Sequence, residues 1–269
     1  MLKPESAISL SRAPIGFKEF EGDRQFATTL ARGLALLRCF TPDQPVLGNK
    51  DLVMRLGLPA ATVSRLTYTL MCMGYLASTE HYGKYQLGAA VLSLALPLSS
   101  QFSALRREAR PLMLALSEAT GGTVSIGIRD RLNVVYIEAV RSWNKRIYPI
   151  EVGTSHSLAG TAIGRATLMS CRLSEREALL KQLQVKAPDE LEKYGLKLLE
   201  NIQNHARLGC CVSVGEVYPD VQAVAVSLGR IQRGEAAAVN CSFQGRHLNA
   251  QWLIDDIAPQ LQALVRQLT

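Results

Sequence analysis

Small, polar and basic side chains recur at helical spacing in the stretch from residue 48 to residue 75. A rotation of 100° per residue after Pro59 places four of them on one face: Ala61, Ser64, Arg65 and Tyr68. A slim helix face with hydroxyl and guanidinium groups can enter the major groove of DNA and reach base edges and phosphates. The pattern therefore favours nucleic-acid recognition, although an ordinary amphipathic helical hairpin with a solvated face has the same period.

Two short helices joined by a tight turn must hold that face. In the first, Leu52, Val53 and Leu56 share one side, and Gly57 stands where a helix stops. Pro59 suits the first position of the second helix, since its missing N–H costs nothing there. The inward face of the second helix is expected to consist of four apolar residues: Val63, Leu66, Leu70 and Met73.

The flanking segments complete a small domain over residues 24–87. A helix is expected over 28–40, with Leu30, Leu34 and Leu37 inward and Arg32 and Arg38 outward. Short strands at 75–76 and 85–87 bracket a basic tip that contains His81 and Lys84, which is typical of a wing. The sequence thus predicts a winged helix-turn-helix domain whose DNA-facing residues are Arg32, Asn49, Lys50, Ala60, Ala61, Thr62, Ser64, Arg65, Tyr68, His81 and Lys84.

Length and charge agree with this interpretation. A chain of 269 residues favours two domains. The net charge is +7, and residues 24–87 contain seven basic residues against three acidic ones, which suits a polyanionic partner.

The six cysteines lie in apolar segments without metal-ligand spacing, so they are expected to be buried reduced thiols, with neither a metal nor a cofactor. The sequence has neither a signal-peptide pattern nor a long uncharged apolar run, which predicts a cytoplasmic protein without a membrane partner.

Outside the first domain, residues 1–23 lack periodicity and are expected to form a flexible tail. Residues 88–100 contain a short apolar helix, starting at Ala89 and ending near Pro97, that must bury itself somewhere. A second copy of the same helix would cover it in a homodimer, while packing within one chain is the alternative.

Residues 101–269 alternate helix and strand patterns. A helix through Leu105 is expected to break or restart at Pro111 and to end at Gly121-Gly122. Strands are expected near 123–128, 134–139, 147–152, 210–214, 223–227 and 236–242, with helices near 174–183, 189–207 and 250–268. The fold class is therefore α+β, with a mostly antiparallel sheet flanked by helices.

Four segments carry a family resemblance by their sequence and order: LARGLALLRCF, DLVMRLGLPAATVSRLTYTLMCMGYL, GTAIGRATLMS and RLGCCVSVGEVYPDVQAVAV. From about Thr28 to the C-terminus, the chain resembles the IclR family of bacterial transcriptional regulators. The resemblance implies a winged helix-turn-helix, a dimerising linker helix and a GAF/PAS-like effector-binding domain. It also implies a dimer or dimer of dimers that binds operator DNA and controls a catabolic operon, commonly for aromatic or other carboxylic acids.

The chain departs from the family pattern after Gly153-Thr154. The usual Arg, Pro and His of that segment are replaced by Ser155, Ser157 and Ala159. The family's pocket positions, together with the helix start beside them, fall at Leu158, Gly160, Thr161, Ala162, Ile163, Glu216, Val221, Ala223, Asn240 and Ser242.

Ser157 suits the N-cap of a helix that begins near Leu158, whose free N–H groups would attract a carboxylate. Ile163, Val221 and Ala223 would form apolar walls, and Asn240 and Ser242 would donate hydrogen bonds from one strand face. Glu216 would either accept from a ligand hydroxyl or hold a pocket residue in place. The expected effector is a small organic acid, aromatic rather than aliphatic.

Two other classes of function compete with a regulator. An enzyme would use Cys210 or Cys211 as nucleophile with a histidine base, chosen from His81, His156, His205 and His247. The chain lacks G-x-S-x-G, phosphate-loop and H-E-x-x-H motifs, so the sequence favours a protein that is not an enzyme. A sensory module that acts through protein partners without DNA is the second alternative.

Overall fold

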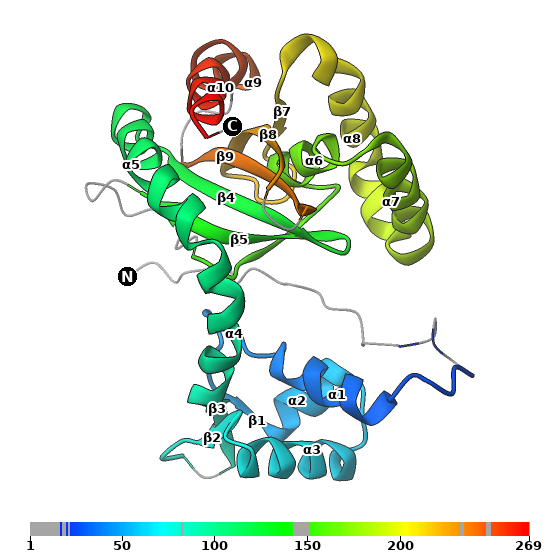
Figure 1. Cartoon of the computed structure of the whole chain (residues 1–269). Coiled ribbons are helices and arrows are strands. Elements are labelled where there is room, and N and C mark those ends of the chain that lie inside the picture. Colours follow the sequence, from blue (N-terminus) through cyan, green and yellow to red (C-terminus); the bar gives the residue numbers. More distant parts are fainter. Residues whose placement is uncertain are drawn as a thin grey trace, which may run out of the picture. The chain divides into compact units, whose positions relative to one another are not determined.

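The structure is a computed structural model that describes residues 17, 20, 22–81, 83–141, 151–231, 234–245 and 249–268 (Figure 1). The chain divides into two compact units, Met1–Leu98 and Ser99–Thr269. Most of the tail expected at residues 1–23 lies outside the described residues. No helix among the described residues is long and apolar enough to cross a membrane.

The described part of the first unit contains the helices α1 (Thr28–Leu37), α2 (Asn49–Leu56) and α3 (Ala60–Cys72), the start of a longer helix, and a small sheet of β1 (Leu47–Gly48), β2 (Leu76–Ser78) and β3 (Lys84–Leu87). The strands pair antiparallel in the order β1-β3-β2. The predicted helices and wing are confirmed, and the two-residue strand β1 is an addition that its length hides from pattern analysis. Gly57 ends α2 in the left-handed region at φ 63°, where its lack of a Cβ removes the strain.

The inward faces of two helices differ from the prediction. Leu30 and Leu34 are 63% and 51% exposed, and the first unit buries Ala35, Leu36, Cys39 and Phe40 instead. Of the three predicted inward leucines, only Leu37 packs against this cluster. Leucines stand on two sides of α1, so periodicity alone does not select the buried side. Met73 is exposed, as are Met71 and Cys72 in the last turn of α3. Pro59 precedes α3 as its N-cap rather than serving as its first residue.

Two helices continue through prolines at which the sequence suggested breaks. Helix α4 (Ala89–Gln101) contains Pro97, and α5 (Ser103–Thr120) contains Pro111 and ends at Gly121 with φ 69°. Each proline removes one backbone hydrogen bond. Both are exposed, so water can reach the carbonyl group that loses its partner.

The second unit is built on a six-stranded sheet in the order β6-β5-β4-β9-β8-β7, in which every neighbouring pair is antiparallel. The strands are β4 (Thr123–Asp130), β5 (Asn133–Val140), β6 (Ser155–Ser157), β7 (Cys211–Val214), β8 (Val221–Arg230) and β9 (Ala236–Gln244). The predicted α+β class with an antiparallel sheet is confirmed.

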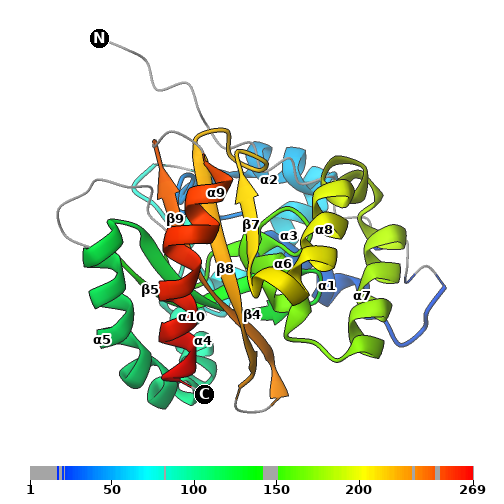
Figure 2. The same cartoon turned by 90° about the horizontal axis from the view of Figure 1, so that it is seen from above.

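Helices cover both faces of this sheet (Figure 2). One apolar cluster joins the sheet to α5, α9 (Ala250–Trp252) and α10 (Ala258–Arg266), which are separated by a π-helical turn, η3 (Leu253–Ile257). A second cluster joins the opposite face to α6 (Ala162–Met169), α7 (Leu173–Lys186) and α8 (Pro188–Leu208).

The segment around residues 147–162 differs from the prediction at the start of one helix. The expected strand at 147–152 lies mostly outside the described residues; Glu151 and Val152 are described and are not in a strand, and a further strand, β6, forms at Ser155–Ser157. The following helix begins at Ala162 rather than near Leu158, because Thr161 is the N-cap and its Oγ1 accepts from the Gly164 N–H.

Candidate functional site

The outward face of α3 carries the residues expected to meet DNA. Ala60, Ala61, Ser64, Arg65 and Tyr68 are all exposed there, and Thr62 is partly buried. The buried face of the same helix contains Val63, Leu66 and Thr67. The apolar contacts therefore hold α3 in place and leave a face of small, polar and basic side chains free for a partner.

Residues of α2 extend this face. The side-chain amide of Asn49 donates to Ser64 Oγ at 2.7 Å, which ties the start of α2 to the middle of α3. Lys50 is exposed beside Asn49, and the other predicted contacts, Arg32 on α1 and His81 in the wing, are partly buried and exposed respectively.

Lys84 has a different environment from the one expected for a wing-tip cation. Its Nζ lies 3.0 Å from Asp51 Oδ2 on α2, and the same carboxylate accepts from the Gly48 N–H at 2.7 Å. These hydrogen bonds, first from Gly48 and then from Lys84, hold the pKa of Asp51 below its usual value. Lys84 thus attaches the wing strand β3 to the start of α2.

The second unit presents a buried polar surface on the α6 side of its sheet. Strand register places Thr123 beside Ser242 and Ser125 beside Asn240, with Ala223 and Ala225 next in the same rows. We call Thr123, Ser125, Asn240 and Ser242 the polar sheet face. All four are buried, although hydroxyl and amide groups normally reach the surface unless they are paired.

Three atoms of the polar sheet face have no hydrogen-bond partner among the described residues: Thr123 Oγ1, Ser125 Oγ and Asn240 Oδ1. The other end of the Asn240 amide donates to Tyr136 Oη at 3.1 Å, and Ser242 Oγ donates to the Thr123 carbonyl at 3.4 Å. Burial raises the pKa of Tyr136, so its phenol stays protonated. An unpaired buried acceptor is costly, and a polar ligand would satisfy it.

His156 lies against this surface from the edge strand β6. It pairs with Val134 of β5, and its ring centroid is 4.4 Å from that of Tyr136, with a 41° angle between the planes. Its Nε2 is buried and has no partner among the described residues. Burial lowers the pKa of His156 to about 4, so the imidazole is neutral at physiological pH.

The N–H groups expected to hold a carboxylate are only partly available. Ser157 Oγ accepts from the amides of Ala159 and Gly160 at 3.2 and 3.0 Å, and it donates to Glu190 of α8. This turn packs so closely on α6 that a Cβ at Gly164 would lie 2.3 Å from the Ser157 carbonyl oxygen. The amides of Ala162 and Ile163, in the first turn of α6, have no partner within an α-helix.

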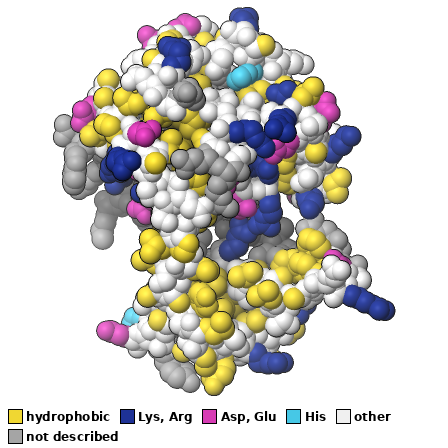
Figure 3. All heavy atoms as spheres, in the orientation of Figure 1, with side chains coloured by type: hydrophobic (Ala, Val, Ile, Leu, Met, Phe, Trp, Pro, Cys, Tyr) yellow, Lys and Arg dark blue, Asp and Glu magenta, His cyan; other side chains and the backbone are white. Residues whose placement is uncertain are grey.

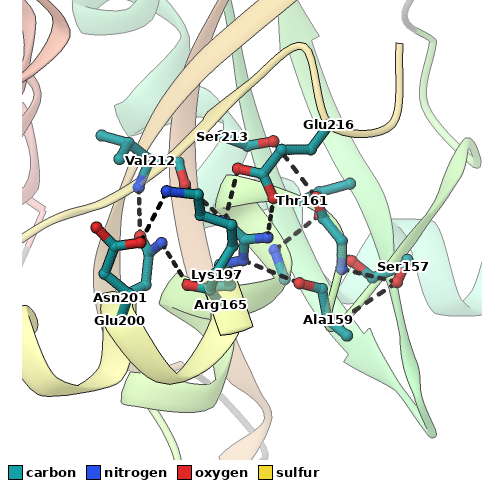
Figure 4. A network of polar contacts seen from close by, with 12 residues as sticks. Ser157, Ala159, Thr161, Arg165, Lys197, Glu200, Asn201, Val212, Ser213 and Glu216 are labelled. Atoms are coloured by element: carbon teal, nitrogen blue, oxygen red, sulfur yellow. Dashed lines mark hydrogen bonds and ion pairs between the residues drawn. The ribbon is translucent and has the colours of Figure 1, made fainter. Parts of the chain in front are cut away.

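The carboxylate of Glu216 forms an ion pair with the guanidinium of Arg165, a residue of α6 that is fully buried (Figure 4). The Arg165 guanidinium donates to both carboxylate oxygens of Glu216, to the Val212 carbonyl at 2.8 Å and to the Ala159 carbonyl at 2.9 Å. The carboxylate neutralises a buried cation. Of the two roles expected for Glu216, this arrangement favours holding a neighbouring residue in place.

The remaining predicted effector residues fall into two groups. Leu158, Ala162 and Ile163 belong to the apolar cluster beneath α6, where a Cβ at Gly127 would lie 2.9 Å from Ile163 Cδ1. Val221 and Ala223 are half-buried on β8, and Ala223 shares a sheet row with Ser242. Gly160 is buried, and the Thr161 hydroxyl is engaged as the N-cap of α6.

Sequence reasoning did not select Thr123, Ser125 or Tyr136, and it named His156 only as one of four candidate bases of an enzyme. One signal for the first two was present: in the run TVSIGI, small or polar residues alternate with apolar ones. That period of two assigns Thr123, Ser125 and Gly127 to one strand face. Tyr136 and His156 gave no comparable signal, because their contacts depend on strand pairing.

The cysteines do not favour nucleophilic catalysis. Burial raises the pKa of Cys210 to about 11 and that of Cys211 to about 12, so neither forms a thiolate readily at neutral pH. Of the candidate bases, His81 is exposed in the first unit, His156 faces Tyr136, burial lowers the pKa of His205, and His247 lies outside the described residues. Within the described ranges, no three His, Cys, Asp or Glu residues form a group that could hold a metal ion.

Comparison with known proteins covers both units. Residues 29–80 match the family model described as the IclR helix-turn-helix domain, and residues 100–269 match the model described as bacterial transcriptional regulator IclR C-terminal.

Among similar proteins, the HTH-type transcriptional regulator TsaQ1/TsaQ2 of Comamonas testosteroni is 34% identical over 242 residues, which cover 89% of this chain and 86% of that protein. The p-hydroxybenzoate hydroxylase transcriptional activator of Acinetobacter baylyi is 29% identical over 260 residues, which cover 89% of each chain. The crystal structure of an IclR family transcriptional regulator from Brucella abortus matches with a TM-score of 0.77 at 36% identity, covering 95% of this chain and 96% of that one.

Proposed function

Because this chain belongs to the IclR family of bacterial transcriptional regulators, we propose that it controls a catabolic operon in response to a small organic acid, aromatic rather than aliphatic. Its family and its helix-turn-helix domain make it a DNA-binding transcriptional regulator and not an enzyme. In our proposal, residues 24–87 bind operator DNA, 88–100 link and dimerise, and 101–269 bind the effector. A protein that binds chromosomal DNA in a bacterium acts in the cytoplasm.

The exposed face of α3 is the observation that carries the proposed mode of DNA binding. In this mode α3 lies in the major groove, where Ser64 and Arg65 read base edges and Tyr68 lies along the groove wall. Asn49 and Lys50 contact the adjacent phosphates from the start of α2, a position at which the helix dipole favours anions. His81 follows the backbone from the wing, and Arg32 adds positive charge from α1.

Two features of the second unit support an acid effector. The first-turn amides of α6, at Ala162 and Ile163, offer N–H groups and the positive end of the helix dipole to one carboxylate. Ala223 of the sheet belongs to the same apolar cluster as Ile163, and this cluster suits a ring. The relative from Acinetobacter baylyi is named for p-hydroxybenzoate hydroxylase, which agrees with an aromatic compound.

The proposed assembly is a homodimer or a dimer of dimers formed through α4. None of the residues of α4, all of which the structure describes, is buried, and its Leu92, Leu94 and Leu96 are 78%, 64% and 65% exposed. Figure 3 shows hydrophobic side chains gathered on this part of the chain. A second copy of α4 is the partner that buries the same residues on both sides of a two-fold axis.

A gel-shift titration tests the regulator proposal. The full-length protein is mixed with DNA from upstream of its own gene and with a scrambled duplex of the same length. The titration is repeated with benzoate, 4-hydroxybenzoate and aliphatic keto acids at increasing concentration. We expect preferential binding of the upstream DNA, with an affinity that an aromatic acid changes. Equal binding of both duplexes would contradict operator recognition, and a response to aliphatic acids alone would contradict the aromatic effector.

A further inference from the structure

Tyr136 connects two polar groups that lack a partner. Its ring packs on the imidazole of His156, and its hydroxyl accepts a hydrogen bond from the Asn240 amide at 3.1 Å. His156 Nε2 and Asn240 Oδ1 are both buried, and neither has a partner among the described residues. Asn240 itself is only 3% exposed, so the orphan oxygen is not an ordinary surface group.

The chemistry of these two atoms selects a particular ligand group. Because the Asn240 amide nitrogen donates to Tyr136, its oxygen is left as an acceptor. A neutral imidazole donates through Nε2 in one of its tautomers. A group that donates to Asn240 and accepts from His156 satisfies both atoms, and a hydroxyl is the smallest such group.

A carboxylate matches these atoms less well. An ionised carboxylate only accepts hydrogen bonds, so it would place negative charge beside the Asn240 oxygen. The buried guanidinium on this side of the sheet, Arg165, is already neutralised by Glu216. The N–H groups of the first turn of α6 therefore remain the better place for an acid group, at a different point of the same face.

We propose that His156, Tyr136 and Asn240 form a hydroxyl-recognition subsite, which makes this regulator select a hydroxylated aromatic acid over the unsubstituted ring. His156 is the specificity-determining residue, and it lies in the segment 153–159 where this chain departs from its family's usual sequence. Asn240 contributes the acceptor, and Tyr136 holds both groups in position. This inference rests on the proposed aromatic-acid effector and adds which substituent the site reads.

Calorimetry with three matched probes tests the subsite: benzoate, 3-hydroxybenzoate and 4-hydroxybenzoate, each titrated into the full-length protein. We expect the wild type to bind at least one hydroxybenzoate roughly tenfold more tightly than benzoate, since one ring substituent then satisfies two buried polar atoms. In His156→Leu this preference should fall to about twofold or less. Benzoate affinity should stay within roughly twofold of wild type, because the carboxylate site is untouched.

Two further variants separate recognition from folding. His156→Gln keeps a donor at this position, so it should restore part of the preference that His156→Leu loses. Ser155→Ala changes the exposed neighbour on the same strand, whose side chain points to the opposite face, and it should behave as wild type. Thermal unfolding of each variant shows whether the domain is intact. If His156→Leu does not fold, the His156→Gln titration decides the question alone, with a preference below that of wild type as the expected result.

The possible failures are distinguishable. An unchanged hydroxyl preference in a folded His156→Leu or His156→Gln protein would overturn the subsite and leave the aromatic effector in place. An absence of preference in the wild type would also overturn it. If none of the three probes binds the wild type, both the subsite and the aromatic effector are wrong, and the gel shift still tests the regulator separately.

Discussion

Arg165 is one of the largest side chains that the second unit buries completely, and the carboxylate of Glu216 is its counter-ion. A buried guanidinium without a counter-ion is strongly unfavourable, whereas exposed ion pairs contribute little. The sequence indicated that Glu216 faces a ligand or a neighbouring residue, and periodicity cannot distinguish the two. Only the pairing of α6 with the loop after β7 identifies the neighbour as Arg165.

Glu216→Gln is therefore expected to act on stability. We expect the free energy of unfolding of the second unit to fall by about 3 kcal/mol, because the substitution leaves the Arg165 charge buried without a counter-ion. Urea denaturation followed by circular dichroism measures it. Glu200→Gln is the matched control, since Glu200 forms an exposed ion pair with Lys197 and its loss should cost less than about 1 kcal/mol. Equal midpoints of urea denaturation for the two variants would contradict a structural role for Glu216.

Arg65 is expected to read a base from the exposed face of α3. Arg65→Ala should then lose about 1–3 kcal/mol of operator binding and most of the preference for operator over scrambled DNA. Fluorescence anisotropy with both duplexes measures the two affinities. Lys50→Ala is the comparison, since a phosphate contact weakens both duplexes alike and reduces the salt slope by about one. Loss of affinity without loss of preference in Arg65→Ala would reject base contact.

At the level of elements, Asp51, Gly48 and Lys84 join the wing to the helix pair. A Cβ at Gly48 would lie 3.3 Å from both the Gly83 carbonyl oxygen and the Lys84 side chain, so the strands approach closely at this point. The basic wing tip was predicted from the sequence. Its ion pair with Asp51 was not, because 33 residues separate the partners and strand β1 brings them together.

Asp51→Asn distinguishes wing positioning from simple electrostatics. Removal of a negative charge near DNA should by itself tighten binding, whereas loss of the wing attachment should weaken operator binding, by roughly threefold to tenfold. We expect the weaker binding. Glu80→Gln, in the same wing and exposed, reports the charge effect alone. Tighter operator binding by Asp51→Asn than by Glu80→Gln would reject the positioning role.

The carboxylate of Asp51 also makes the stability of the first unit depend on pH. The pKa of Asp51 is lowered in the folded protein, so its contribution to stability is fully present above the ordinary Asp pKa of 3.8. That contribution is lost as pH falls through the lower folded value. The difference in melting temperature between wild type and Asp51→Asn should therefore persist at neutral pH and shrink below about pH 4.

Sequence patterns located most helices and strands, and the errors have local physical causes. Pro97 and Pro111 were interpreted as breaks, yet an exposed helix tolerates proline where water reaches the freed carbonyl. Ser157 has the side chain of an N-cap, but it caps a turn four residues before the true N-cap, Thr161. Both residues suit the role by type, and only the packing of α6 on the sheet decides between them.

At the scale of the whole molecule, the polar sheet face shows why a site is harder to predict than a fold. Asn240 and Ser242 were placed correctly on one strand face, because alternation along a strand is local. Their neighbours Thr123 and Ser125 come from a strand more than 100 residues earlier. His156 joins through an edge strand of three residues. Such a site exists only after the sheet has assembled.

The last expectation concerns assembly, and it depends on the leucines of α4. If Leu92 and Leu96, which lie one turn apart on the same face of α4, meet their counterparts across a two-fold axis, Leu96→Glu places two like charges in an apolar interface. We expect the mass from sedimentation to fall towards that of one chain, and binding to paired half-sites to be lost, since only a dimer spans both. Leu196→Glu is the matched control, because Leu196 on α8 is 87% exposed and lies outside the proposed interface. A Leu96→Glu protein that sedimented as wild type and still bound its operator would show that this face of α4 does not hold the dimer together.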